Sequence, residues 1–259
     1  MPFFRTLRAP FGRRLAAVAA LALLGLPLPT RSLADPDDGA PVQLTVKRKK
    51  ILVPPPNGMV SVMGQDWLLD AIFQANIQRN SYLEAVFIPS FAWSNYVERR
   101  RDDLFLADFA IVQTRKRLPF DDQENCDTFD RLRTMMDNSF HLRINSTVSP
   151  LRPVMDASNE DAAKDAASNL DIEETQMIPL TILRSDNHAF SAICATRYSA
   201  TVDGQKKSWM MVVGLSMVLT RDRIVYLYKY KRGPPDPLRV GAIRRSMAEW
   251  TSSVLGVNT

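Results

Sequence analysis

The side chains best suited to acid–base or nucleophilic chemistry are two histidines, His141 and His188, and two cysteines, Cys126 and Cys194. His188 and Cys194 lie six residues apart in a stretch expected to be extended, and the rise of a strand separates them by roughly 20 Å. These two residues therefore cannot act as a catalytic pair. A pair of Cys126 and His141 stays open, because their spacing alone does not fix their distance in space.

No cofactor or metal motif accompanies these residues. Neither histidine has a partner at a metal-ligand spacing, such as a second histidine four positions away on a helix. The run 121–125 lacks the alternating acids and the glycine of a calcium loop. A glycine-rich phosphate loop, a dinucleotide fingerprint and a Gly-x-Ser-x-Gly elbow are all missing. We therefore expect no catalytic residue, no metal and no cofactor.

The first 34 residues have the pattern of a secretory signal peptide. Arginines precede the apolar run 15–28, which is shorter than the about 20 residues that a membrane-spanning helix needs. Small residues at 32–34 complete the pattern, with cleavage expected after Ala34. We therefore expect a periplasmic or secreted protein with no membrane span in the mature chain. An anchor that stays uncleaved is the alternative.

Removal of this leader changes the charge of the protein. The leader holds five of the 33 basic residues and none of the 28 acidic ones, so the mature chain carries 28 of each sign. Nucleic-acid binding needs a basic face that neutralises phosphates. The balanced charge therefore argues against a nucleic-acid partner.

Export would also place the cysteines in an oxidising compartment. A disulfide between Cys126 and Cys194 would close a long loop and stabilise the fold by about 4 kcal/mol in the chain-entropy model. The alternative is that Cys194, which follows Ile193 on an expected strand, is a buried small apolar residue. The sequence leaves both interpretations open.

Aromatic side chains provide the candidate ligand or partner surface. In the alternating strand 224–231, Tyr226, Tyr228 and Tyr230 share one face, and tyrosine is well suited to interfaces. In the alternative interpretation, a helix covers Ile224 and Tyr226 in the core, and Tyr230 is exposed to solvent.

A second aromatic stretch contains Trp93 and Tyr96 and precedes the arginines 99–101. Aromatic rings beside arginines suit a stacked or anionic ligand, so both rings are candidate surface residues. The alternative is a short surface helix with both rings turned inward.

The basic run 47–50 follows an expected strand at 42–46. It suits contact with an anionic surface, but we favour a solvated turn that guards the strand edge against aggregation. The prolines 54–56 then form a rigid extended connector.

The last third of the chain predicts three antiparallel strands and a helix. The strands cover 190–202, 208–219 and 224–231, and Asp203-Gly204 is a strong hairpin-turn pair. Asp236 can cap the helix, whose apolar residues recur at intervals of three and four: Val240, Ile243, Met247, Trp250 and Val254. A helix on an antiparallel sheet defines an α+β fold.

The remainder of the chain predicts further strands and helices of the same domain. The expected strands cover 42–46, 82–88, 104–113 and 177–184, and the expected helices begin at Asp66 and before Phe129. We expect one α+β domain over 35–259, made of an N-terminal half (42–155), an acidic helix or linker (156–170) and a C-terminal sheet with its helix (177–256).

The C-terminal strands, ending in Ile-Val-Tyr-Leu-Tyr at 224–228, and the Trp-bearing helix at 244–255 resemble the close of Mog1/PsbP-like α/β domains. This resemblance covers about a quarter of the chain and rests on layout. It implies an α/β/α sandwich used as a binding or accessory module, and it transfers no site residue. The chain as a whole resembles exported bacterial proteins.

These observations favour a soluble, exported, non-catalytic protein that binds a protein or small-molecule partner in the cell envelope. Two alternatives stay open: a hydrolase whose site has no recognisable motif, and a subunit of a secreted or membrane-attached assembly.

Overall fold

The computed structural model describes residues 39–75, 77, 80–98, 107–116, 125–144, 172–202 and 205–259. All of them belong to the unit Asp35–Thr259. The expected leader, the acidic helix or linker at 156–170 and the arginines 99–101 lie outside the described residues.

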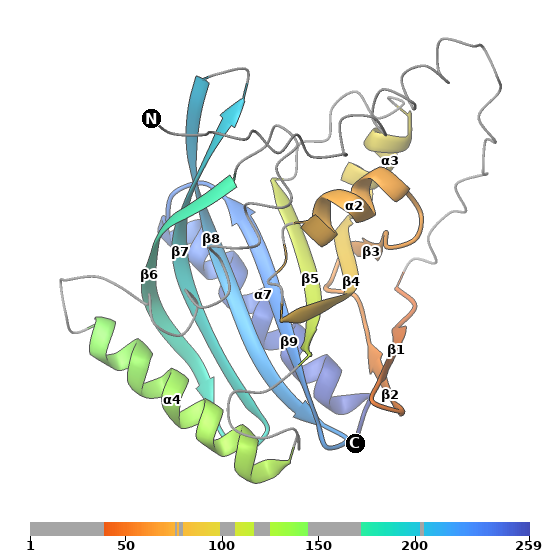
Figure 1. Cartoon of the computed structure of the whole chain (residues 1–259), viewed down its shortest axis with the longest axis vertical. Coiled ribbons are helices and arrows are strands. Elements are labelled where there is room, and N and C mark those ends of the chain that lie inside the picture. Colours follow the sequence, from red (N-terminus) through yellow and green to blue (C-terminus); the bar gives the residue numbers. More distant parts are fainter. Residues whose placement is uncertain are drawn as a thin grey trace, which may run out of the picture. The chain divides into compact units, whose positions relative to one another are not determined.

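A seven-stranded antiparallel sheet forms the centre of the fold (Figure 1), in the order β3-β4-β5-β9-β8-β7-β6. Its strands are β3 (Met59–Ser61), β4 (Ser81–Pro89), β5 (Asp108–Arg115), β6 (Ile172–Ser185), β7 (Ala189–Val202), β8 (Gln205–Thr220) and β9 (Arg223–Arg232). A separate hairpin pairs β1 (Val42–Val46) with β2 (Lys49–Val53). The helices are α2 (Trp67–Ala75), α3 (Ser90–Glu98), α4 (Cys126–Ile144) and α7 (Pro237–Gly256).

The C-terminal strands form the long hairpins that the sequence predicts. Val202 pairs with Gln205, so two residues connect β7 to β8. Arg221 and Asp222 connect β8 to β9 with φ values of 48° and 58°, as a mirror-type turn requires. Residues 211–220 of β8 are buried throughout, which confirms that this apolar strand is central.

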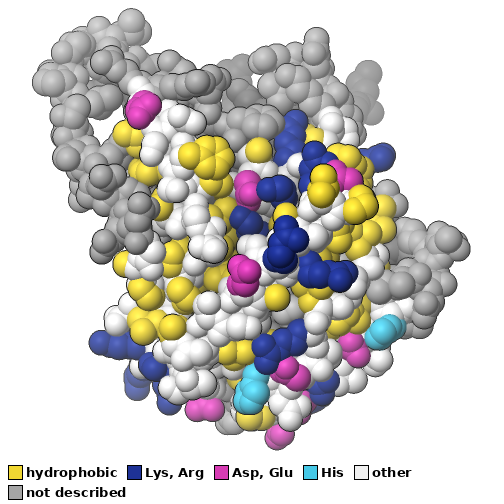
Figure 2. Space-filling model, turned by 180° about the vertical axis from the view of Figure 1, so that it is seen from behind, with side chains coloured by type: hydrophobic (Ala, Val, Ile, Leu, Met, Phe, Trp, Pro, Cys, Tyr) yellow, Lys and Arg dark blue, Asp and Glu magenta, His cyan; other side chains and the backbone are white. Residues whose placement is uncertain are grey.

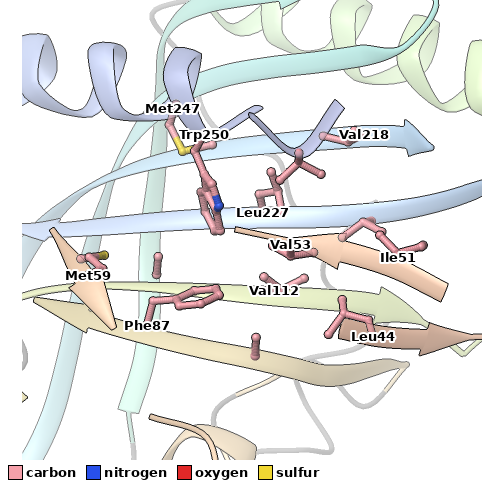
Figure 3. Close-up of a cluster of buried hydrophobic side chains, with 14 of the residues drawn as sticks. Leu44, Ile51, Val53, Met59, Phe87, Val112, Val218, Leu227, Met247 and Trp250 are labelled. Atoms are coloured by element: carbon pink, nitrogen blue, oxygen red, sulfur yellow. The ribbon is translucent and has the colours of Figure 1, made fainter. Parts of the chain in front are cut away.

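One face of the sheet is covered by α7 and the β1–β2 hairpin. Asp236 caps α7 by accepting a hydrogen bond from the backbone N–H of Arg239 at 2.8 Å. Gly214 lets α7 approach β8 closely, since a Cβ atom there would lie 2.3 Å from Met247 Cγ. Trp250 points between the hairpin and the sheet, packs edge-on against Phe87 and donates its Nε1–H to Pro54 O at 2.7 Å (Figure 3). The predicted apolar stripe is thus confirmed as the buried side of α7.

The end of the chain fastens the hairpin to this face. Asn258 lies directly after α7, and its side-chain oxygen accepts from the N–H of Leu52 at 2.9 Å. Its amide group donates to Leu52 O and Val254 O, both at 2.7 Å. Asn258 therefore satisfies the backbone N–H and C=O of Leu52 on the outer edge of β2, as a neighbouring strand would.

The opposite face carries α4, which lies across β6, β7 and β8 (Figure 1). Phe129, Leu132 and Phe140 are buried there, and Phe140 meets Phe190 edge-on at 5.8 Å. On the β5 side, Phe73 of α2 packs edge-on against Phe109 at 5.4 Å. Helices therefore cover both faces, and the fold is α+β with antiparallel sheets and helices packed on them. None of the helices within the described ranges is long and apolar enough to cross a membrane.

Two sequence predictions needed correction. The strand expected at 104–113 runs from Asp108 to Arg115, and β3 was not predicted. Within the single domain that the sequence predicts, β5 pairs with β9 along six registered residue pairs. This pairing joins segments more than a hundred residues apart, which local periodicity cannot show.

Candidate ligand-binding face

Five half-buried aromatic rings share the face of the sheet that carries α4. We call them the aromatic face: Phe109, Tyr198, Trp209, Tyr228 and Tyr230. Strand alternation and register place them there, since Tyr230 pairs with Phe109 on one side and with Val213 on the other. In the same way Trp209 pairs with Tyr198.

The rings of the aromatic face form two stacks. Phe109 and Tyr230 have centroids 4.5 Å apart and planes inclined by 13°, and Tyr228 continues the stack 6.3 Å beyond Tyr230. Tyr198 and Trp209 form the second stack, at 6.1 Å and 21°. Offset stacking holds such rings in fixed orientations, so a planar ligand would meet preformed surfaces.

The floor between the two stacks is apolar. Cys194, Met211 and Val213 are buried and pack among Phe109, Trp209 and Tyr230. Thr196 lies opposite Met211 on the same face, is fully buried, and its Oγ1 has no hydrogen-bond partner among the described residues. A buried hydroxyl without a partner is costly to the folded state.

One arginine lies beside these rings, and a second lies over Tyr226, a ring of the same strand outside the aromatic face. The guanidinium of Arg232 lies 5.7 Å from the centroid of Trp209. Arg115 lies 5.3 Å from the centroid of Tyr226. Both distances are within the range of cation–π attraction. The face thus combines flat apolar surfaces with a cation, which suits a planar apolar group that carries a negative charge.

The three predicted tyrosines do not share one environment. Tyr226 is 7% exposed and belongs to the core beneath α4, whereas Tyr228 and Tyr230 are half-buried. Tyr226 belongs to the same buried cluster as Phe129 and Phe140 of α4, whereas Tyr230 packs at the margin of the separate cluster around Met211. Phe109, Trp209 and Tyr198 were not predicted, because their membership depends on the pairing of distant strands.

Trp93 and Tyr96 do not lie on the surface. Each is 4% exposed, and their rings contact one another at 5.7 Å. Tyr96 donates its hydroxyl to Asp66 Oδ2 at 3.2 Å, while Asp66 Oδ1 accepts from the N–H of Leu69 at the start of α2. Trp93 and Tyr96 are therefore not surface residues, and the alternative of a short helix with both rings turned inward is confirmed; the rings fix α3 to the cap of α2.

The predicted disulfide is not formed in the structure. Cys126 is an exposed free thiol at the start of α4, and Cys194 is a buried free thiol whose Sγ donates to Val213 O at 3.6 Å. Cys126 and His141 lie fifteen residues apart on the same helix, which separates them by about 22 Å along its axis. The thiol–imidazole pair that the sequence left open is thus excluded.

Neither histidine lies in a catalytic arrangement. The side chain of His141 is 63% exposed, and its Nε2 lies 3.8 Å from Asp137 Oδ1 on the surface of α4. His188 is exposed in the turn between β6 and β7. Within the parts of the chain that the structure describes, no three His, Cys, Asp or Glu side chains gather as metal ligands.

A buried ion pair lies on the opposite, α7 side of the sheet. Lys229 is 6% exposed, and its Nζ lies 2.5 Å from Asp108 Oδ1 and 3.1 Å from Met59 Sδ. Lys231 Nζ contacts the other oxygen of Asp108 at 3.2 Å. Burial lowers the pKa of Lys229 from its ordinary value, although the Asp108 carboxylate opposes this change. The charged pair joins β5 to β9 and does not belong to the aromatic face.

Comparison with known proteins gives structural resemblance only. No family model and no curated protein matches the sequence. Among solved structures, the fold is similar to a point mutant of the protein Mog1, with a TM-score of 0.33, 11% identity, and coverage of 85% of this chain and 94% of that one. It is also similar to the Saccharomyces cerevisiae Ran-binding protein Mog1p, with a TM-score of 0.30, 10% identity and the same coverage. These resemblances are weak, and no residue role is transferred from them.

Proposed function

We propose that this chain is an exported, non-catalytic binding protein of the cell envelope whose aromatic face takes the ligand. The observation that carries the proposal is the pair of aromatic stacks, Phe109–Tyr230–Tyr228 and Tyr198–Trp209, beside the guanidinium of Arg232. Tyrosine and tryptophan present large rigid surfaces with few torsions to immobilise, so they bind flat apolar groups at low entropic cost.

The ligand class follows from the same residues. A planar apolar group would stack on Tyr230 or Trp209, and a carboxylate, sulfonate or phosphate on it would face Arg232. We favour binding over hydrolysis because both histidines lie on exposed surfaces outside the aromatic face.

Titration with 1-anilinonaphthalene-8-sulfonate tests the aromatic face, since this probe combines a planar apolar group with an anion. We expect saturable binding of one probe per folded chain, and about tenfold weaker binding by Tyr230→Leu, which loses a stacking partner. Leu238→Ser is the matched control, because Leu238 is 85% exposed on α7 and lies outside the aromatic face. Equal effects of the two substitutions, with unchanged thermal unfolding, would contradict the proposal.

The export part of the proposal is supported by the leader pattern alone and needs its own test. Expression with the native N-terminus in a Gram-negative host, followed by intact-mass measurement of the periplasmic fraction, should give a chain that begins at Asp35. A full-length cytoplasmic product would contradict export without affecting the binding test.

A further inference from the structure

Two hairpin turns that are distant in sequence lie side by side and form what we call the basic corner: Lys47, Arg48, Lys49 and Lys50 with Arg221 and Arg223. Arg221 Nη1 donates to Lys50 O at 2.8 Å, and Arg223 Nη2 donates to Lys47 O at 3.4 Å. The basic corner lies at the lower left of the surface in Figure 2.

Positive charge predominates at the basic corner. The carboxylate of Asp222 lies at the basic corner, with its Oδ2 3.9 Å from Lys49 Nζ. The six basic residues of the basic corner outnumber this carboxylate. Residues 47–50 are all exposed, so this excess charge faces solvent.

The backbone of both turns is unfavourable for the residues that occupy it. Lys47, Arg48, Arg221 and Asp222 all have positive φ, between 44° and 71°. Residues with a Cβ atom are disfavoured in this region, and Asn-Gly is the preferred pair for such turns. The four consecutive basic side chains also repel one another. Folding alone therefore does not explain the choice of Lys47 and Arg48 at the β1–β2 turn.

Arg221 and Arg223 have a structural role as well, because they donate to backbone carbonyls of the hairpin. Each guanidinium keeps its charge in doing so and has five N–H donors in total. These contacts hold the two arginines next to the basic run. Folding thus converts a run of four basic residues into a compact patch of six.

An exposed apolar side chain accompanies the patch. Val257 is 40% exposed, and its neighbour Asn258 contacts both Arg221 and Leu52 of β2. Cations beside exposed apolar groups suit the headgroup region of a bilayer. The charges are confined to two turn tips and do not follow a groove, which disfavours a nucleic-acid backbone as partner.

We propose that the basic corner docks the protein reversibly on an anionic membrane surface by contacting lipid phosphates. This inference does not depend on the aromatic face or on its ligand. Clusters of four to eight Lys and Arg residues bind anionic leaflets in a salt-dependent way.

The test is co-sedimentation of the purified protein with vesicles of phosphatidylglycerol and phosphatidylcholine in equal parts, or of phosphatidylcholine alone. We expect binding to the anionic vesicles only, lost at high salt. The variant Lys47→Asn/Arg48→Gly introduces the preferred turn residues, so it should raise the thermal unfolding midpoint and yet weaken vesicle binding at least about tenfold. These opposite changes separate loss of binding from loss of folding.

The matched control is Arg244→Gln/Arg245→Gln, which removes the same charge from an exposed stretch of α7 and should leave vesicle binding unchanged. Equal weakening by control and variant, or no binding to anionic vesicles, would overturn the proposal. So would displacement by inorganic phosphate at constant ionic strength, which would indicate a free-phosphate site. Tighter binding to duplex DNA than to vesicles would also overturn it.

Discussion

The two faces of the sheet are built from the same strands but differ in how completely their side chains are satisfied. On the α7 face, Gly214 admits α7 to close contact, and Trp250 belongs to a core of buried apolar residues from α7 and eight strands. On the α4 face, the aromatic rings are half-buried and Thr196 has a buried hydroxyl without a partner. One face is closed by packing, and the other leaves its aromatic rings half-buried.

Hydroxyl groups show this difference at the scale of single atoms. On the α7 face, Ser191, Ser216 and Thr251 form a buried chain, with Oγ···Oγ at 2.5 Å and Oγ···Oγ1 at 2.7 Å. This chain ties β7 and β8 to α7 and satisfies each hydroxyl. Thr196, on the same strand β7 but facing the other way, lacks such a partner among the described residues.

The largest expected effect compares the two tryptophans. Trp250→Ala should lower the free energy of unfolding by about 4 kcal/mol, because it leaves a large cavity and an unpaired Pro54 carbonyl. Trp209→Ala, on the half-buried aromatic face, should lower it by about 1 kcal/mol. Urea unfolding measures both values. Equal losses would show that the aromatic face is as much a part of the core as the α7 face.

The next effect concerns the single buried ion pair described on the α7 side. Asp108→Asn should destabilise the protein by about 3 kcal/mol, since it leaves the Lys229 ammonium buried without a carboxylate. Asp70→Asn is a surface control, because its carboxylate accepts from the exposed N–H of Gly64. A loss below about 1 kcal/mol for Asp108→Asn in urea unfolding would contradict the closed character of this region.

Replacing a threonine by the isosteric valine should change the free energy of unfolding in opposite directions on the two faces of the sheet. Thr251→Val should destabilise by about 1 kcal/mol, because it removes the partner of Ser216. Thr196→Val should stabilise by about 1 kcal/mol, because it replaces an unpartnered buried hydroxyl with a methyl group. Thermal unfolding of both variants shows whether each substitution stabilises or destabilises the protein. Destabilisation by Thr196→Val would mean that its hydroxyl is satisfied in solution.

The smallest effect is a pH dependence at Lys229. Burial lowers the pKa of Lys229 in the folded state, because the native state disfavours the charged form. The protein is therefore more stable above pH 10.5, and this added stability is lost as the pH falls through the lowered pKa. Lys229→Met should therefore stabilise by up to about 1 kcal/mol at neutral pH, where Lys231 still pairs with Asp108. This advantage should shrink above pH 10.5 in urea unfolding measured across pH. An advantage that grows there would contradict the sign of the shift.

Local sequence patterns predicted most of the elements around the aromatic face. The alternation from Ile224 to Lys231 placed the tyrosines on one side of β9, and the stripe from Val240 to Val254 placed α7 on the other. The sequence left the position of Trp93 and Tyr96 open, since an aromatic residue beside charges has the same local pattern whether it faces water or the core. The packing of α3 decides between these, because it buries both rings and lets Tyr96 donate to Asp66.

The sequence by itself determined the antiparallel hairpins, the capped helix on the sheet and the basic turn at 47–50, because turn chemistry, capping and periodicity act within a few residues. Tertiary structure alone decided that β5 joins β9, which brings Phe109 onto Tyr230. It also decided that Arg221 meets Lys50. Such contacts depend on non-local pairing, whose partners are selected by the packing of the whole sheet and leave no periodic trace in either segment.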